Sequence, residues 1–86
     1  MNYFEMTVEQ LLKEYLLLAS QAFQAKTNYF HYYLLYTTSQ GMNKEAREFY
    51  IQNEKEYDKL SSKLIHLDDI LLAKGVDAEF LEKVRF

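Results

Sequence analysis

Residues 11–36 read LLKEYLLLASQAFQAKTNYFHYYLLY. Along this stretch apolar or aromatic residues recur at alternating spacings of four and three, at Leu11, Tyr15, Leu18, Ala22, Ala25, Tyr29, Tyr32 and Tyr36. Such spacing gathers them on one face of an α-helix. Just upstream, Thr7 and Gln10 have the residue types and the separation of a capping box, in which each side chain accepts from the other residue's backbone N–H. The pattern predicts a helix over about residues 8–39.

A second helix is predicted over about residues 44–74. Asn43 is a favourable N-cap residue, and Glu45 follows in the first turn, where the helix dipole favours an acid. The apolar stripe of this helix has the same spacing and consists of Ala46, Tyr50, Asn53, Tyr57, Leu60, Leu64, Leu67 and Leu71. Because only a short turn at about residues 40–43 joins the two helices, they must lie antiparallel.

The two glycines of the chain mark the ends of these helices. Gly41 and Gly75 each follow a periodic run, at the place where a C-cap glycine sits. Asp77 then has the character of an N-cap residue, which predicts a short helix over about residues 77–85 that folds back over the open end of the hairpin. The sequence contains no repeat or linker, so residues 1–86 are expected to form one all-α domain.

Charge is distributed unevenly between the two long helices. Between Leu16 and Asn43 the only charged residue is Lys26, whereas acids and bases dominate residues 44–59. Residues 29–36, YFHYYLLY, place large side chains all round the first helix, because successive residues turn by about 100°. A helix that is apolar all round is normally a central one. We therefore predict that the first helix lies in the middle of an assembly.

The predicted interface consists of large side chains that one neighbouring helix cannot cover, with His31 and two tyrosines among them: Leu16, Leu17, Phe23, Tyr29, Phe30, His31, Tyr33, Leu34 and Leu35. The favoured arrangement is a homodimer of hairpins that forms a four-helix bundle. A second possibility is a different protein, which this chain would regulate or inhibit through the same face. In a third, the short C-terminal helix and residues 1–6 cover the patch within the chain.

Composition argues against several other partners. The net charge is −3 and the basic residues are scattered among acids, so we expect neither nucleic acid nor an anionic membrane surface as a partner. No apolar run reaches the roughly 18–20 residues that a membrane span needs. The first residues, MNYFEM, lack the layout of a secretory signal, and we expect a cytoplasmic protein.

The candidate chemical residues are few, and cysteine is absent. Ser62, His66 and Asp69 share one helix face, but an exposed helix surface offers no oxyanion hole. His31 has no acid or histidine three or four residues away, and neither histidine follows a glutamate by three, as a di-iron bundle site requires. We therefore expect no catalytic residue, no cofactor and no metal site, and a protein that is not an enzyme.

Asn53 is the one polar residue in the second apolar stripe. A buried asparagine in such a seam can specify register and oligomeric state, at some cost in stability. Alternatively, its amide could bind the hydroxyl of Tyr29 on the other helix. Both roles are structural.

Overall fold

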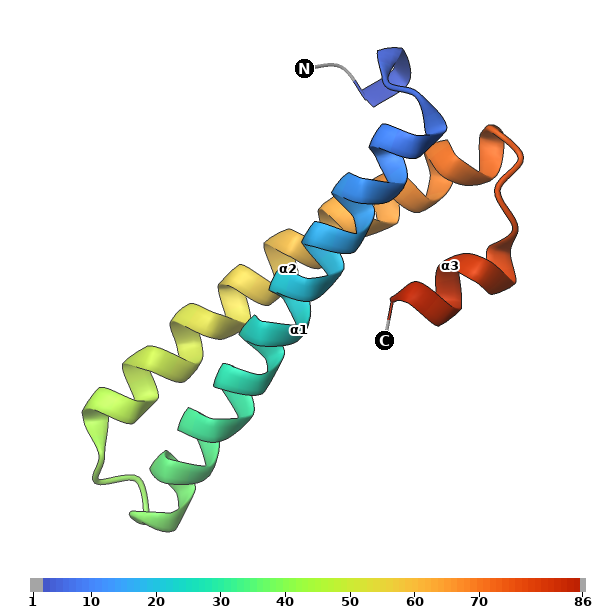
Figure 1. The fold of residues 1–86 in the computed structure, drawn as a ribbon. Coiled ribbons are helices and arrows are strands. Elements are labelled where there is room, and N and C mark those ends of the chain that lie inside the picture. Colours follow the sequence, from blue (N-terminus) through green and yellow to red (C-terminus); the bar gives the residue numbers. More distant parts are fainter. Residues whose placement is uncertain (1–2, 86) are drawn as a thin grey trace.

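The computed structural model describes residues 3–85, which form two long helices and two short ones. In chain order they are the 3₁₀ turn η1 (Tyr3–Glu5), α1 (Val8–Thr38), α2 (Lys44–Ala73) and α3 (Ala78–Val84). The helices α1 and α2 lie side by side and antiparallel along a molecule 49 Å in its longest dimension (Figure 1). The predicted all-α hairpin with a short C-terminal helix is confirmed.

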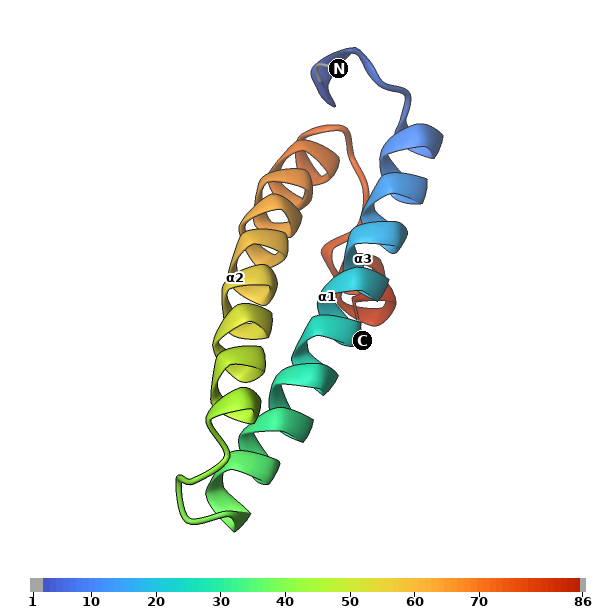
Figure 2. The ribbon, with the colours of Figure 1, turned by 90° about the vertical axis from the view of Figure 1, so that its left-hand side faces the viewer.

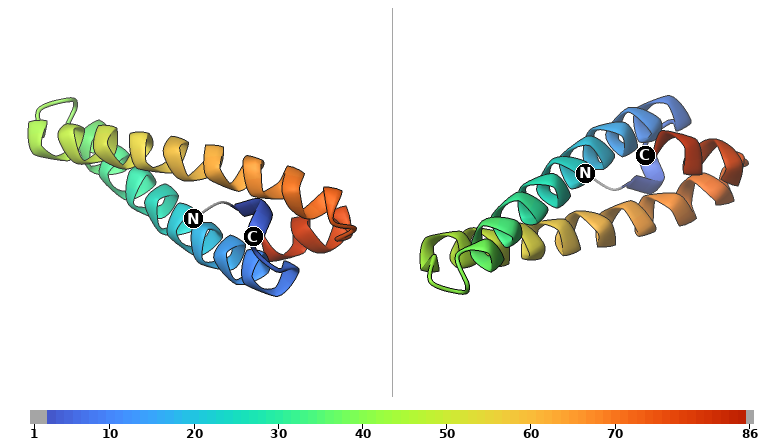
Figure 3. Two further views of the ribbon diagram at one scale, coloured as in Figure 1. Left: turned by 90° about the horizontal axis from the view of Figure 1, so that it is seen from above. Right: turned by 90° about the horizontal axis from the view of Figure 1, so that it is seen from below.

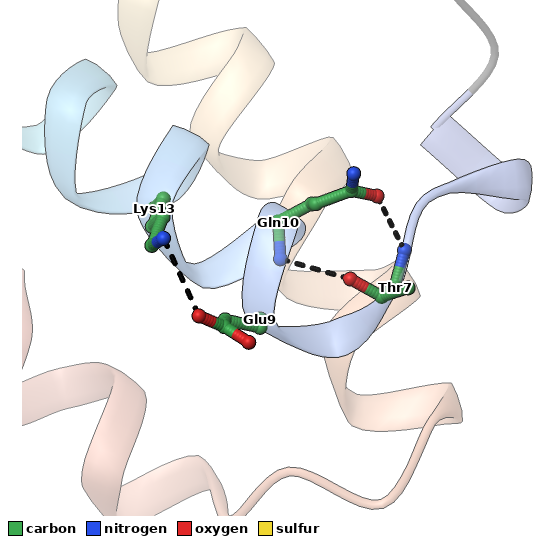
Figure 4. Close-up of polar contacts among 4 residues, drawn as sticks. All are labelled: Thr7, Glu9, Gln10 and Lys13. Carbon is green, nitrogen blue, oxygen red and sulfur yellow. Dashed lines mark hydrogen bonds and ion pairs between the residues drawn. The ribbon is translucent and has the colours of Figure 1, made fainter.

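The first turn of α1 is stabilised by the predicted capping box (Figure 4). The backbone N–H of Gln10 donates to Thr7 Oγ1 at 3.2 Å, and the backbone N–H of Thr7 donates to Gln10 Oε1 at 3.0 Å. Glu9 and Lys13 add an ion pair of 3.3 Å one turn apart. Both ion-pair side chains are exposed, so water screens this pair and it contributes little to stability. The cap therefore sets where α1 begins.

A tight turn reverses the chain after Thr38. Gln40 and Gly41 have backbone φ angles of 57° and 78°, in the left-handed region that glycine adopts without strain. The next helix begins at Lys44, because Asn43 Oδ1 accepts from the backbone N–H of Ala46 at 3.0 Å. The predicted N-cap at Asn43 is confirmed.

The direction of α3 is set by a second left-handed glycine. Gly75 has a φ angle of 93°, and the N–H of Val76 donates to the carbonyl oxygen of Leu71 at 3.0 Å, which closes the end of α2. Asp77 Oδ1 then accepts from the backbone N–H of Glu79 at 3.0 Å and caps α3. Figures 1 and 2 show that α3 folds back and ends beside the middle of α1.

The hydrophobic core lies toward the open end of the hairpin. Its buried residues are Leu11, Tyr15, Leu18, Ala19, Ala22, Ala25, Leu60, Leu64, Leu67, Ile70, Leu71 and Leu81. The two long helices diverge toward this end, where η1 and α3 also lie (Figure 3). Leu81 of α3 fills part of the space, and Tyr3 and Met6 pack against the same core. Ala19 and Ile70 lie outside the predicted stripes and are buried at the end where these two short pieces add cover.

A polar cluster lies beside this core and joins all three helices. Arg85 Nη1, just after α3, pairs with Asp68 Oδ2 of α2 at 3.2 Å. The hydroxyl of Tyr15 on α1 and the other oxygen of Asp68 are buried, and neither has a hydrogen-bond partner among the described residues. Burial first, and then the Asp68 carboxylate, raise the pKa of Tyr15 to about 12, whereas Arg85 acts in the opposite direction. We expect the hydroxyl to donate to Asp68 in solution, because two buried oxygens would otherwise stay unpaired.

This raised pKa predicts a loss of stability in alkali. Between about pH 10 and pH 12 the unfolded chain gives up the Tyr15 proton and the folded chain keeps it, so the free energy of unfolding falls as pH rises through that range. Below pH 10 the contribution is fully present. The variant Tyr15→Phe should lose less stability over the same range, as measured by denaturant midpoints at several pH values. Parallel losses in both proteins would contradict the assignment, since the other tyrosines and the lysines are common to both.

Candidate interaction surface

The half of the hairpin next to the turn is held together by aromatic side chains. Tyr29, Tyr33 and Tyr36 of α1 surround Tyr50 of α2, with ring centroids 5.8, 5.4 and 5.6 Å from it. Tyr29 and Tyr33 also stack on each other at 5.9 Å. In the described chain between residues 26 and 59 only Ala46 is buried. This half is therefore a two-helix layer with open faces.

α1 exposes much of the apolar surface that the sequence predicts, along both of its halves. Leu16, Leu17, Phe23, Phe30, Tyr33, Leu34 and Leu35 are all exposed, with His31, whereas Tyr29 is half-buried against Tyr50. Phe23, Phe30 and Leu34 are 63%, 53% and 59% exposed, respectively. Neither α3 nor η1 covers these three side chains.

The structure divides the predicted interface residues between two sides of α1. Phe23 and Phe30 line hollows between α1 and α2 on the side where α3 lies. Leu34 follows Phe30 by four residues and points the same way. Leu35 follows Leu34 by one residue, so it points about 100° away, as does Leu17 from Leu16. We call the surface around Leu17 and Leu35 the far side of α1.

Beyond the end of α3, a groove continues between α1 and α2 toward the turn. It consists of two hollows of about 230 and 280 Å³ that share Lys26 and Tyr57. Phe23 lines the first hollow, and Phe30 and Glu54 line the second. Arg85 lies at the α3 end of the first hollow. We call this continuous feature the helix groove. One of its ends meets α3, and the part toward the turn is open.

Lys26 and Glu54 lie on opposite walls of the helix groove. Lys26 comes from α1 and Glu54 from α2. The ion pairs among the described residues are Glu9–Lys13 and Asp68–Arg85, so Lys26 and Glu54 do not form one with each other. Tyr29 lies beside them, and its pKa is raised by loss of solvent and, to a smaller degree, by Glu54. The hydroxyl of Tyr29 therefore stays neutral at ordinary pH.

Sequence reasoning overlooked the α2 wall of this groove, but a signal for the α1 wall exists. A second set of residues on α1 follows spacings of four and three, as a second helical seam would: Leu12, Leu16, Ala19, Phe23, Lys26 and Phe30. This second stripe runs beside the main one. Two of its residues lie next to α3, since Ala19 and Phe23 line a hollow with Val84.

The residues considered for catalysis or for register take ordinary structural positions. The Ser62 hydroxyl donates to the carbonyl oxygen of Asp58 at 3.0 Å. The ring centroid of His66 lies 6.0 Å from that of Tyr3. The Asn53 amide donates to the carbonyl oxygen of Phe49 at 2.8 Å, within its own helix. The alternative in which Asn53 binds Tyr29 is therefore wrong, because Tyr29 packs against Tyr50 instead.

Residues 3–85 contain no group of three or more histidine, aspartate or glutamate side chains arranged to hold a metal ion. None of the helices in this part of the chain is long and apolar enough to cross a membrane. Comparison of the chain with protein-family models, with curated proteins and with solved structures gives no match. The exposed apolar surface of α1 is therefore the feature from which a function can be argued.

Proposed function

We propose that this protein is a non-enzymatic interaction protein that associates with itself through the apolar surface of α1. The observation that carries the proposal is the exposure of Phe23, Phe30 and Leu34 on the groove side of α1, in the part of that helix whose only charged residue is Lys26. Contiguous exposed apolar surface of this kind is typical of binding sites. The aromatic residues add contact area at small entropic cost, which suits an interface.

The magnitudes favour association. Phe23, Phe30 and Leu34 each leave on the order of 100 Å² of apolar side chain exposed. At about 25 cal/mol per Å², burying this area on two copies contributes roughly 15 kcal/mol. Association costs about 4–15 kcal/mol in lost translational and rotational freedom. Apolar burial by three residues per copy is therefore large enough to offset that cost.

The distribution of charge indicates which helix is central in the assembly. The outer surface of α2 carries Glu48, Lys55, Asp58 and other exposed charged residues, so it is well solvated. The outer surface of α1 carries uncharged polar residues such as Ser20 and Gln24, which cost less to remove from water. A dimer with both α1 helices inside and both α2 helices outside removes the uncharged surface from water and leaves the charged surface solvated. It is a four-helix bundle.

The solution mass over a hundredfold range of concentration tests the proposal, measured by light scattering or sedimentation. A dimer has twice the 10.3 kDa mass of one chain. We expect this mass at micromolar concentration, with dissociation at the dilute end. A monomer at every concentration would overturn self-association. It would favour the alternative in which α1 presents the same surface to a different protein as a regulator or inhibitor.

A further inference from the structure

α3 lies at one end of the helix groove and leaves the rest of the groove open. α3 contains 7 residues, so it is about 10 Å long, whereas the molecule measures 49 Å. Between Arg85 and the turn, the groove is lined mainly by large and aromatic side chains, including Phe23, Phe30 and Tyr57. The open part continues along the same side of the hairpin as α3.

We propose that α1 of a second copy occupies this groove, antiparallel to the first and related to it by a two-fold axis near Asn28. The inference rests on the proposed function and specifies its geometry. Phe23 and Leu34 lie at about equal distances along α1 on either side of this axis. Phe23 of each copy therefore meets Leu34 of the other copy. Every α1 helix then lies in the groove of the partner copy, and the contact is closed and self-complementary.

The length of α3 fits this arrangement. An axis near Asn28 places the end of α1 of one copy, at Thr38, opposite Ala19 of the other. Ala19 lies beside Val84 and Arg85, where α3 ends. The end of the partner helix therefore meets the end of α3, and the two occupy successive parts of one groove.

The charges in the groove are also complementary to a second copy. Glu54 and Lys26 line the same hollow, close to the level of the axis. The two-fold axis brings Lys26 of each copy toward Glu54 of the other. Lys26 is the only charged residue between Leu16 and Asn43, so α1 brings no second charge into the partner's groove. Opposite charges at such positions fix register and partner choice.

The available area reaches that of a specific dimer. Phe23, Phe30, Tyr33 and Leu34 each expose on the order of 100 Å², or roughly 800 Å² of apolar surface from two copies. Stable interfaces start at about 1,200 Å² in total, of which somewhat more than half is apolar. The four side chains therefore supply the apolar share of a standard interface.

A charge exchange between copies tests the geometry. The variants Lys26→Glu and Glu54→Lys each place like charges together at two symmetric positions, and each should weaken the dimer by about 10- to 100-fold. Mixing the two variants restores opposite charges at both positions, so a heterodimer should form with nearly the wild-type dissociation constant. Sedimentation measures the dissociation constants, and circular dichroism checks that each variant keeps its helices.

The possible results separate this inference from the proposed function. Weakened single variants and a restored mixture support the two-fold groove. If the single variants dimerise like wild type, the groove geometry is wrong although self-association stands. If mixing fails to restore binding, the two charges do not meet between copies and the geometry is again wrong. A monomeric wild-type protein would overturn both the geometry and the proposed function.

Discussion

Replacing Phe30 by glutamate should convert the proposed dimer into a monomer at micromolar concentration. Phe30 is 53% exposed in the single chain and lines the second hollow of the helix groove. In the proposed dimer the substitution removes apolar contact and buries a second carboxylate in the hollow that already holds Glu54, in each copy. Several kcal/mol are lost at each of the two symmetric positions. We expect the dissociation constant to rise at least about 1,000-fold, measured by sedimentation.

The isolated hairpin should survive this substitution, because the Phe30 side chain is outside the core. A helical monomer by circular dichroism is therefore the expected product. A dimer with wild-type affinity would exclude Phe30 from the interface.

Two neighbouring leucines provide a matched control. Leu34 is 59% exposed on the groove side, and Leu35 is 41% exposed on the far side. Leu34→Glu should weaken association strongly, whereas Leu35→Glu introduces the same charge one residue later and should leave it almost unchanged. Equal effects from both variants would place the interface outside the groove.

The second large effect is expected in the core. Leu67 is 0% exposed and belongs to the core, which lies toward the open end of the hairpin. Truncating it to alanine removes apolar contacts and leaves a cavity, which costs about 2–5 kcal/mol. A small domain has a total stability of about 5–15 kcal/mol, so this is a large part of it. The melting temperature should fall by about 10 °C or more.

Leu17→Ala is the control for this prediction. Leu17 is also a leucine, but it is half exposed on the far side of α1. Its truncation should change the free energy of unfolding by roughly 1 kcal/mol or less. Both variants must be compared with wild type at one protein concentration, because association adds to apparent stability. Similar losses for Leu17→Ala and Leu67→Ala would show that the core is not where the structure places it.

Local sequence signals were sufficient to predict the helices. The caps at Thr7, Asn43 and Asp77 act on backbone groups two or three residues away, so their effect does not depend on the rest of the fold. The glycines after α1 and α2 act equally locally, through a left-handed backbone conformation. The antiparallel hairpin then follows from the shortness of the turn.

The apolar stripes predicted only part of the core. Leu11, Leu18, Leu60 and Leu67 are buried as their spacing indicates. Tyr50 and Tyr57 lie on the same predicted stripe but are only partly buried, because nothing within the described chain covers the turn half of the hairpin. Periodicity identifies a helix face, but the number of layers packed on that face depends on the whole fold.

The sequence by itself determined that α1 has more apolar surface than one neighbouring helix can cover. Only the tertiary structure decided how that surface is divided, with Leu34 on the groove side and Leu35 on the far side. It also placed Lys26 and Glu54 in one groove, although 28 positions separate them in the chain. The physical reason is that helical periodicity gives directions around one helix axis. The rotation of α1 against α2, and the side that α3 takes after Gly75, depend on contacts between residues far apart in sequence.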